Sequence, residues 1–181
     1  SISELFDTKF VTVDSRISTL ESATDYRSVL DAANVTTHVG NLSKEGRGEF
    51  DLFYSCSTLQ RVPEAELPKL LETATSHLCQ GGYSYHTIHP KDYHAQYDSS
   101  LEPLQYLSYP DEVWTRITSR RFSSQNRLRH VDFLRLFRQA GFQNVYDRTA
   151  SYHPSRVKNV DLAQRFQSYT AEELVIAQVQ L

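Results

Sequence analysis

Short runs of β-branched and aromatic residues alternate along the chain with stretches whose apolar positions recur at helical spacing. This alternation is typical of an α/β protein. Residues 50–57 (FDLFYSCS) give the clearest strand, because a nearly continuous apolar run is expected of a strand that is buried on both faces. The other expected strands cover residues 9–14, 35–39, 83–88, 144–147 and 174–181.

Helices are predicted between these strands, where apolar residues fall on one face. Pro63 favours the start of a helix over residues 64–78, whose leucines stand at helical spacing. Gly81 and Gly82 are expected to stop this helix and lead into the next strand. The other expected helices cover residues 21–33, 111–121 and 130–140, with a short one at 161–166.

The composition is that of a globular protein. Of the 181 residues, 39% are hydrophobic and 23% charged, which predicts a single domain over residues 1–181. No apolar run approaches the roughly 20 residues of a membrane span, and the N-terminal sequence carries no signal-peptide pattern. The net charge of −3 argues against a general nucleic-acid binder.

The two cysteines, Cys56 and Cys79, lie in apolar stretches of sequence. Two buried thiols in a reducing compartment are the simpler interpretation, and a disulfide is the alternative. With no span or signal in sight, the cytoplasm is the expected location.

The regular pattern is lost between residues 89 and 129. This stretch is rich in tyrosine and arginine and is predicted to form an insertion that caps a substrate pocket. The simpler alternative is that its aromatic side chains pack the segment against the sheet.

Four blocks of sequence resemble class I S-adenosylmethionine-dependent methyltransferases. Residues 50–63 are similar to the family's fourth strand and the turn after it, and residues 78–83 (LCQGGY) to its L-x-P-G-G block before the fifth strand. Residues 134–142 (LRLFRQAGF) resemble its LFxxAGF helix, and residues 171–181 its last strand. The resemblance implies a three-layer, Rossmann-like fold with a mostly parallel sheet and an antiparallel C-terminal strand.

The resemblance also implies contacts to the cofactor S-adenosylmethionine. Asp14 ends a segment that resembles the family's second strand, where an acid holds the ribose hydroxyls; the alternative is an ordinary acid at a strand end. Gly40 and Asn41 stand where the family often has Gly-Asp beside the adenine. Ser55 lies at the carboxyl end of the clearest strand, where open α/β sheets bind ligands.

One part of the family pattern is missing. The first strand and its glycine-rich turn should precede residue 9, but the segment SISELFDT contains no glycine. Glycine is needed there because a Cβ would collide with the ligand. Three arrangements are compatible with this gap: the chain is a fragment, a partner chain completes the sheet, or the sheet has closed over the gap without a cofactor.

Three histidines surround the end of the strand at 83–88, a position that faces the methyl acceptor in the family. His86 and His89 are the expected general bases, since imidazole titrates near neutral pH, and His94 is an expected substrate contact. The alternative is that they are histidines of a polar loop. A zinc site is disfavoured because no cysteine or paired acid completes the set, so no metal is predicted.

Residues 126–129 (NRLR) resemble a stretch of some small-molecule methyltransferases. Asn126, Arg127 and Arg129 are therefore expected to bind the substrate, because planar guanidinium groups suit a carboxylate or phosphate. Ion pairs with nearby acids are the alternative.

The function expected from the resemblance is methyl transfer from S-adenosylmethionine to a small-molecule oxygen or nitrogen nucleophile. The alternative is a non-catalytic methyltransferase-like subunit that serves in the assembly of a complex. A dinucleotide-binding domain of another kind ranks last, because the chain lacks G-x-G-x-x-G.

Overall fold

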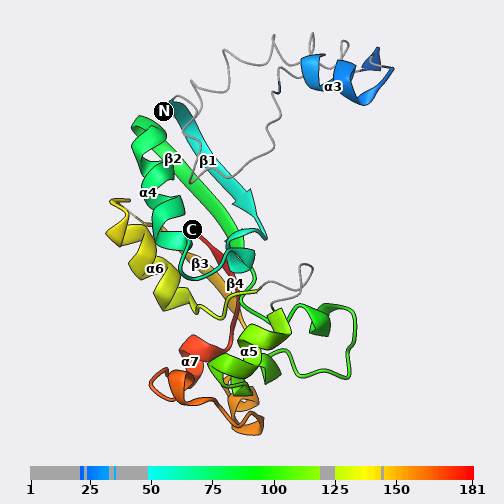
Figure 1. The fold of residues 1–181 in the computed structure, drawn as a ribbon, viewed down its shortest axis with the longest axis vertical. Helices are drawn as coiled ribbons and strands as arrows, with labels where there is room; N and C mark the ends of the chain where they lie inside the picture. The colour runs from blue at the N-terminus through cyan, green and yellow to red at the C-terminus, as the bar shows by residue number, and fades with distance from the viewer. Residues whose placement is uncertain (1–20, 23, 33–34, 36–48, 119–124, 144) are drawn as a thin grey trace. The chain divides into compact units, whose positions relative to one another are not determined.

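The computed structural model describes residues 21–22, 24–32, 35, 49–118, 125–143 and 145–181 (Figure 1). The chain divides into two compact units, Ser1–Gly40 and Asn41–Leu181. Helix α3 (Tyr26–Ala32) in the first unit lies within the helix predicted at 21–33. Apart from Val35, the strands predicted at 9–14 and 35–39 fall outside the described residues. The single domain over residues 1–181 stays a prediction.

The second unit contains a four-stranded mixed sheet in the order β1-β2-β4-β3. Strands β1 and β2 run parallel, and β4 runs antiparallel to both of its neighbours. The strands are β1 (Phe50–Cys56), β2 (Leu78–Ile88), β3 (Arg148–Ser151) and β4 (Ile176–Gln180). The α/β class and the antiparallel C-terminal strand are therefore confirmed, whereas the three-layer, Rossmann-like arrangement stays a prediction.

Helices α4 (Leu67–His77) and α6 (His130–Gln139) lie side by side on one face of this sheet (Figure 1). Each presents an apolar stripe to the strands, and Gly141, with a φ of +94°, allows the chain to leave α6. The core consists of Leu59, Leu67, Leu71, Ile88, Leu128, Phe133, Phe137, Val179 and Leu181. Each large side chain buried in it stabilises the fold by about 1.5–3 kcal/mol.

A second cluster of buried side chains lies among the helical turns that follow β2 and precede β4. It involves helices α5 (Asp111–Thr118) and α7 (Ala171–Leu174), the latter closed at its start by a capping box between Thr170 and Glu173. Its members are Leu104, Tyr106, Leu107, Val160, Phe166, Leu174 and Val175. The described part of the insertion predicted at 89–129 thus packs against the segment at 152–175.

The prediction that residues 50–57 are buried on both faces is wrong. Leu52 and Tyr54 of β1 are 55% and 57% exposed, while the alternate residues Phe53 and Ser55 are half-buried beneath the helices. Among the described residues, β1 pairs with β2 alone. The physical reason is that α4 and α6 cover one face of β1 and no described element covers the other.

Several predicted boundaries also shift. Strand β2 begins at Leu78, directly after α4, and Gly81 adopts a φ of +80° inside β2, where the register with β1 shifts. The two glycines therefore lie at an irregularity within the strand and do not mark the end of the helix. The strand expected at 144–147 forms instead at residues 148–151.

The short helix expected at 161–166 is a single 3₁₀ turn, Gln164–Phe166. Both cysteines are free thiols, and the expectation of burial is wrong for Cys56, which is exposed. No helix built from the described residues has the length and apolar character that a membrane crossing requires.

Candidate functional site

The predicted catalytic residues, His86 and His89, lie at the carboxyl end of β2, and the predicted cofactor contact Ser55 lies at that of β1. Because these strands are parallel, their ends lie at the same edge of the sheet, and the register pairs Ser55 with His86. Side chains alternate between the two faces of a strand, so Ser55 and His86 both face the helices. Ser57 and His89 follow at the ends of the two strands.

His86 is fully buried and both of its ring nitrogens have hydroxyl partners. Ser55 Oγ lies 2.7 Å from Nδ1, and Ser84 Oγ lies 2.6 Å from Nε2. The rings of Phe53 and Phe137 lie 4.7 and 5.1 Å from the imidazole, centre to centre. Burial lowers the pKa of His86 to about 4. His86 is thus a neutral, internal group, and the structure does not bring it to an open site.

Ser57 and His89 form the second hydroxyl–imidazole pair, with Ser57 Oγ 2.8 Å from His89 Nδ1. This pair is only half-buried. Ser57 adopts a φ of +53°, the left-handed region that favours glycine, and its backbone N–H donates to the Thr87 carbonyl. Burial, and then the charge of Lys91, lower the pKa of His89, which favours the neutral imidazole near pH 7.

Polar and aromatic side chains follow on the turns beyond each strand. The Arg61 guanidinium lies over the Tyr93 ring, 4.1 Å from its centre, and the Tyr93 and Tyr97 hydroxyls lie 3.1 Å apart. The hydrogen bond to Tyr93 is the largest cause that raises the pKa of Tyr97. His94, the predicted substrate contact, is exposed and its ring meets the edge of Tyr93. These contacts bring basic and aromatic side chains together on the segments after β1 and β2.

Of the predicted cofactor contacts, Asp14, Gly40 and Asn41 lie outside the described residues. Ser55 is described, and its hydroxyl points beneath the helices to His86. A side chain held there does not fit a contact with S-adenosylmethionine at the rim of the sheet. No contact to this cofactor can therefore be derived from the described part of the chain.

Asn126, a predicted substrate contact, is buried and makes hydrogen bonds within the protein. Its side-chain Nδ2 donates to the carbonyl oxygens of Leu59 and Val62, each 2.8 Å away, and its Oδ1 accepts from the Leu128 N–H. Only 7% of Asn126 is exposed. Its amide thus fastens the segment before α6 to the turn after β1.

Arg127 is also buried, and its guanidinium donates to the carbonyl oxygens of Tyr106 and Tyr109 and to the Asp111 carboxylate. It lies over the rings of Trp114 and Phe166, 5.3 and 5.1 Å from their centres. Desolvation by burial lowers the pKa of Arg127 from its usual value, and the nearby charge of Arg165 adds to this effect. Arg127 therefore links residues of the second cluster through buried hydrogen bonds and ring contacts.

Arg129 has no exposed surface. It donates to the carbonyl oxygens of Pro90, Leu174 and Ile176 and to the Tyr106 hydroxyl. In the described arrangement neither this arginine nor Arg127 presents a free guanidinium to a substrate.

Ser57 shares with Ser55 a signal in the sequence, because both lie at the carboxyl end of the clearest predicted strand, where open α/β sheets bind ligands. The residues that sequence reasoning missed are Arg61 and Tyr93. The sequence holds no signal for their contact, since it joins positions that are 32 residues apart.

Within the described ranges, no group of three or more His, Cys, Asp or Glu side chains could hold a metal ion. His86 and His89 instead have serine hydroxyls as partners. No known family model matches the chain, and no curated protein matches it.

Proposed function

We propose that the protein binds a small molecule with a hydroxyl or amine group beside Ser57 and His89, and that His89 takes the proton from that group. The observation that carries this proposal is the 2.8 Å contact between Ser57 Oγ and His89 Nδ1. It lies at the carboxyl edge of the parallel strand pair, the usual place of ligand sites in open α/β sheets.

The chemistry follows from the two ring nitrogens of His89. With its proton on Nδ1, the imidazole donates to Ser57 Oγ and keeps a lone pair on Nε2. The lowered pKa of His89 keeps this form populated near pH 7. Nε2 then accepts the proton of the bound hydroxyl or amine, which makes that group a better nucleophile; general-base catalysis of this kind contributes about 10²–10⁴-fold.

The reaction served by this base is proposed to be methyl transfer, on the resemblance of four sequence blocks to the methyltransferases. The order of the strands, with an antiparallel strand at the C-terminus, is consistent with that resemblance. S-adenosylmethionine is proposed as the methyl donor only on the basis of the sequence resemblance, because the described position of Ser55 does not fit a contact with it.

Two measurements test the proposal. Titration calorimetry with S-adenosylhomocysteine checks the cofactor class, and transfer from radiolabelled S-adenosylmethionine to a panel of phenols, carboxylates and amines checks the reaction. We expect His89→Gln to lower transfer about 100-fold with unchanged binding of S-adenosylhomocysteine. His77→Gln, on α4, is the matched control. Absence of both binding and transfer would contradict the proposal.

An exposed apolar face supports the alternative of a non-catalytic assembly subunit. The described face of β1 and β2 opposite the helices presents Leu52, Tyr54, Tyr83 and Tyr85, each at least 42% exposed, and the rings of Tyr54 and Tyr85 stack 5.9 Å apart. Exposed apolar patches commonly mark interaction surfaces. A chain that stays monomeric in sedimentation experiments and turns over a methyl acceptor would exclude this alternative.

A further inference from the structure

Ser57 is held in a strained backbone conformation at the end of β1. Among the described residues other than glycine, it alone has a positive φ, of +53°. Strain of this kind persists only where the surrounding structure holds it in place. Two groups at the end of β2 do so here: the Thr87 carbonyl accepts from the Ser57 N–H at 2.8 Å, and His89 Nδ1 lies 2.8 Å from Ser57 Oγ. The hydroxyl is therefore fixed against the imidazole before any ligand binds.

The chain around Ser57 runs from a strand through a strained serine into a helical turn. Strand β1 ends at Cys56, and a 3₁₀ turn follows over Leu59–Arg61. In α/β enzymes with a nucleophilic serine, a sharp turn of this order presents the hydroxyl at the top of the sheet. Those enzymes carry glycine two positions before and after the serine, where this chain has Ser55 and Leu59. The likeness is therefore one of local geometry.

The residue after Ser57 offers a hydrogen-bond donor. The backbone N–H of Thr58 has no acceptor within the described ranges, and the Thr58 hydroxyl donates to the Cys56 carbonyl at 3.1 Å. In enzymes with a nucleophilic serine, the N–H of the following residue stabilises the negative oxygen that forms when the serine attacks a carbonyl. Thr58 thus supplies one such donor directly beside Ser57.

His89 is placed to take the proton of Ser57. When the imidazole carries its own proton on Nε2, the Nδ1 lone pair accepts from the Ser57 hydroxyl. Burial, and then the charge of Lys91, lower the pKa of His89, so the neutral ring that can act as a base is present near pH 7. The charge of Lys91 opposes the imidazolium that forms during attack and favours the negative oxygen, so its two effects on the transition state are opposite.

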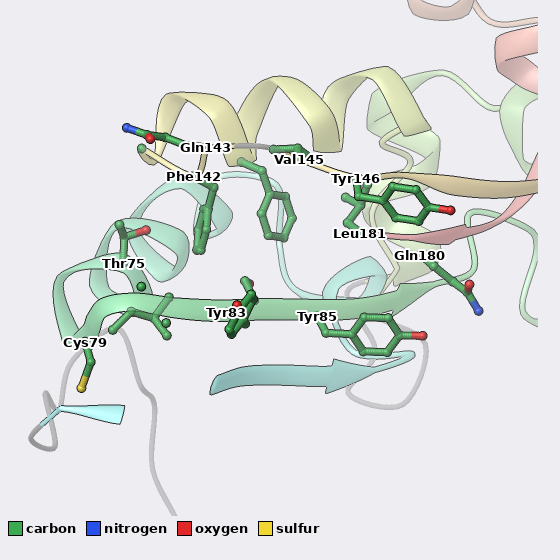
Figure 2. Close-up of a pocket in the computed structure, with 16 residues that line it drawn as sticks. Thr75, Cys79, Tyr83, Tyr85, Phe142, Gln143, Val145, Tyr146, Gln180 and Leu181 are labelled. Carbon is green, nitrogen blue, oxygen red and sulfur yellow. The ribbon is translucent and has the colours of Figure 1, made fainter. Parts of the chain in front are cut away.

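The two serines that contact His86 are less suited to this role. Ser84 lines a pocket of about 710 Å³, which Figure 2 shows along β2 beside Tyr85. Its hydroxyl and that of Ser55 share the two nitrogens of the His86 ring, of which only one accepts a proton when the ring is neutral. That ring is fully buried and its pKa is lowered to about 4, so it is a weak base. Ser57 has a half-buried base of its own.

We propose that Ser57 is a nucleophile that hydrolyses small esters through an acyl intermediate, with His89 as the general base and the Thr58 N–H as the oxyanion donor. Ser57 Oγ attacks the carbonyl carbon, its proton passes to His89 Nδ1, and the carbonyl electron pair moves to the oxygen. The bond to the alcohol oxygen then breaks, and the alcohol leaves with the proton from Nδ1. A water molecule attacks the acyl group in the same way, which releases the acid and returns a proton to Oγ.

This activity goes beyond the proposed function. Methyl transfer uses Nε2 of His89 as the base, whereas ester hydrolysis uses Nδ1, so the two reactions need different tautomers of one ring. Ester hydrolysis needs no S-adenosylmethionine. Failure of either activity therefore leaves the test of the other unaffected.

A fluorophosphonate, which forms a stable adduct with an activated serine hydroxyl, tests the nucleophile in the whole chain. We expect one adduct per chain by intact mass, mapped to Ser57 by peptide mass spectrometry. His89→Gln should slow the labelling at least tenfold. The labelling rate should rise with pH as His89 loses its proton and then level off, with a midpoint below the ordinary value of 6.5, because the pKa of His89 is lowered.

Matched variants at the end of β1 separate the serines. Ser57→Gly removes the hydroxyl and relieves the strained φ, and it should abolish labelling while the fold is retained. Ser55→Ala removes the hydroxyl two positions earlier and should leave labelling unchanged. Hydrolysis of p-nitrophenyl acetate gives a second readout, which should be at least tenfold slower in Ser57→Gly than in the parent protein.

Four outcomes would overturn the proposal. The first is no adduct after prolonged exposure to the fluorophosphonate at millimolar concentration. The second is an adduct on Ser84 or on the exposed Cys56 in place of Ser57. The third is labelling of His89→Gln at the rate of the parent protein, because the imidazole would then not act as the base. The fourth is hydrolysis of p-nitrophenyl acetate at equal rates by Ser57→Gly and the parent protein.

Discussion

Arg129 donates from Nη2 to the carbonyl oxygen of Ile176, 2.8 Å away, at the first residue of β4. The same nitrogen lies 2.7 Å from the Leu174 carbonyl oxygen at the end of α7, and Nη1 lies 2.7 Å from that of Pro90. One buried guanidinium therefore satisfies three backbone carbonyls from two segments that are far apart in the sequence. It connects the segment after β2 with the start of the last strand.

Arg129→Lys tests the structural role of this side chain. A lysine keeps the charge but cannot reach the same oxygens with a planar fork, so it leaves buried acceptors unpaired. We expect the free energy of unfolding to fall by about 3 kcal/mol or more, measured by urea denaturation. Arg135→Lys, at an exposed position of α6, is the control and should change the stability by less than about 0.5 kcal/mol. A small effect of Arg129→Lys would show that the network carries little stability.

Asn126→Asp tests whether the amide donates as described. The change keeps the shape of the side chain but replaces two N–H donors by an acceptor that faces the carbonyl oxygens of Leu59 and Val62. We expect a loss of about 2–4 kcal/mol in the free energy of unfolding at pH 7. The exposed Asn159→Asp should be nearly neutral in the same denaturation experiment. Equal stability of the two variants would contradict the internal role of Asn126.

The elements with strong periodicity could be predicted from the sequence. The leucines of α4 and the apolar stripe of α6 require burial on one face, and both helices lie close to their expected bounds. Strand β1 was also placed correctly, but its exposure was not. An apolar run shows that a segment favours a strand, whereas its burial depends on which elements cover it, and sequence spacing does not encode this.

The roles of the polar residues were harder to predict for a related reason. Asn126, Arg127 and Arg129 were expected to meet a substrate because amide and guanidinium groups suit anions. Their partners are mainly backbone carbonyls, and backbone groups carry no signature in the sequence. His86 and His89 were correctly placed at the end of β2. Although only three positions separate them, the His86 imidazole is buried and that of His89 is half-buried.

The pH dependence of stability should report on His86. Its pKa is about 4 in the folded protein against 6.5 as the ordinary value, so the unfolded state binds more protons between these two values. The stability due to the neutral imidazole is therefore fully present above pH 6.5 and is lost as the pH falls toward 4. We expect a loss of about 2 kcal/mol at pH 5 relative to pH 7.5, measured by urea denaturation.

His86→Gln is the control for this pH effect, because glutamine can bond Ser55 and Ser84 but does not titrate. The variant should show a smaller loss of stability between pH 7.5 and pH 5 than the parent protein does. His89, whose pKa is also lowered, contributes in the same direction in both proteins and cancels in the comparison. Identical pH profiles would mean that His86 does not titrate out of its buried site in this range.

Two substitutions of Ser57 separate its backbone strain from its hydrogen bond. Both Ser57→Ala and Ser57→Gly remove the hydroxyl that meets His89, but only glycine adopts a φ of +53° without steric cost. The left-handed conformation costs about 1–2 kcal/mol for a residue with a Cβ. We therefore expect the glycine variant to be about 1 kcal/mol more stable than the alanine variant in urea denaturation, the reverse of the usual order within a strand. An alanine variant as stable as the glycine one would show that residue 57 is not held in the left-handed region. If the proposed function is correct, both variants should lose His89-dependent transfer equally, because relief of strain does not restore the partner of Nδ1.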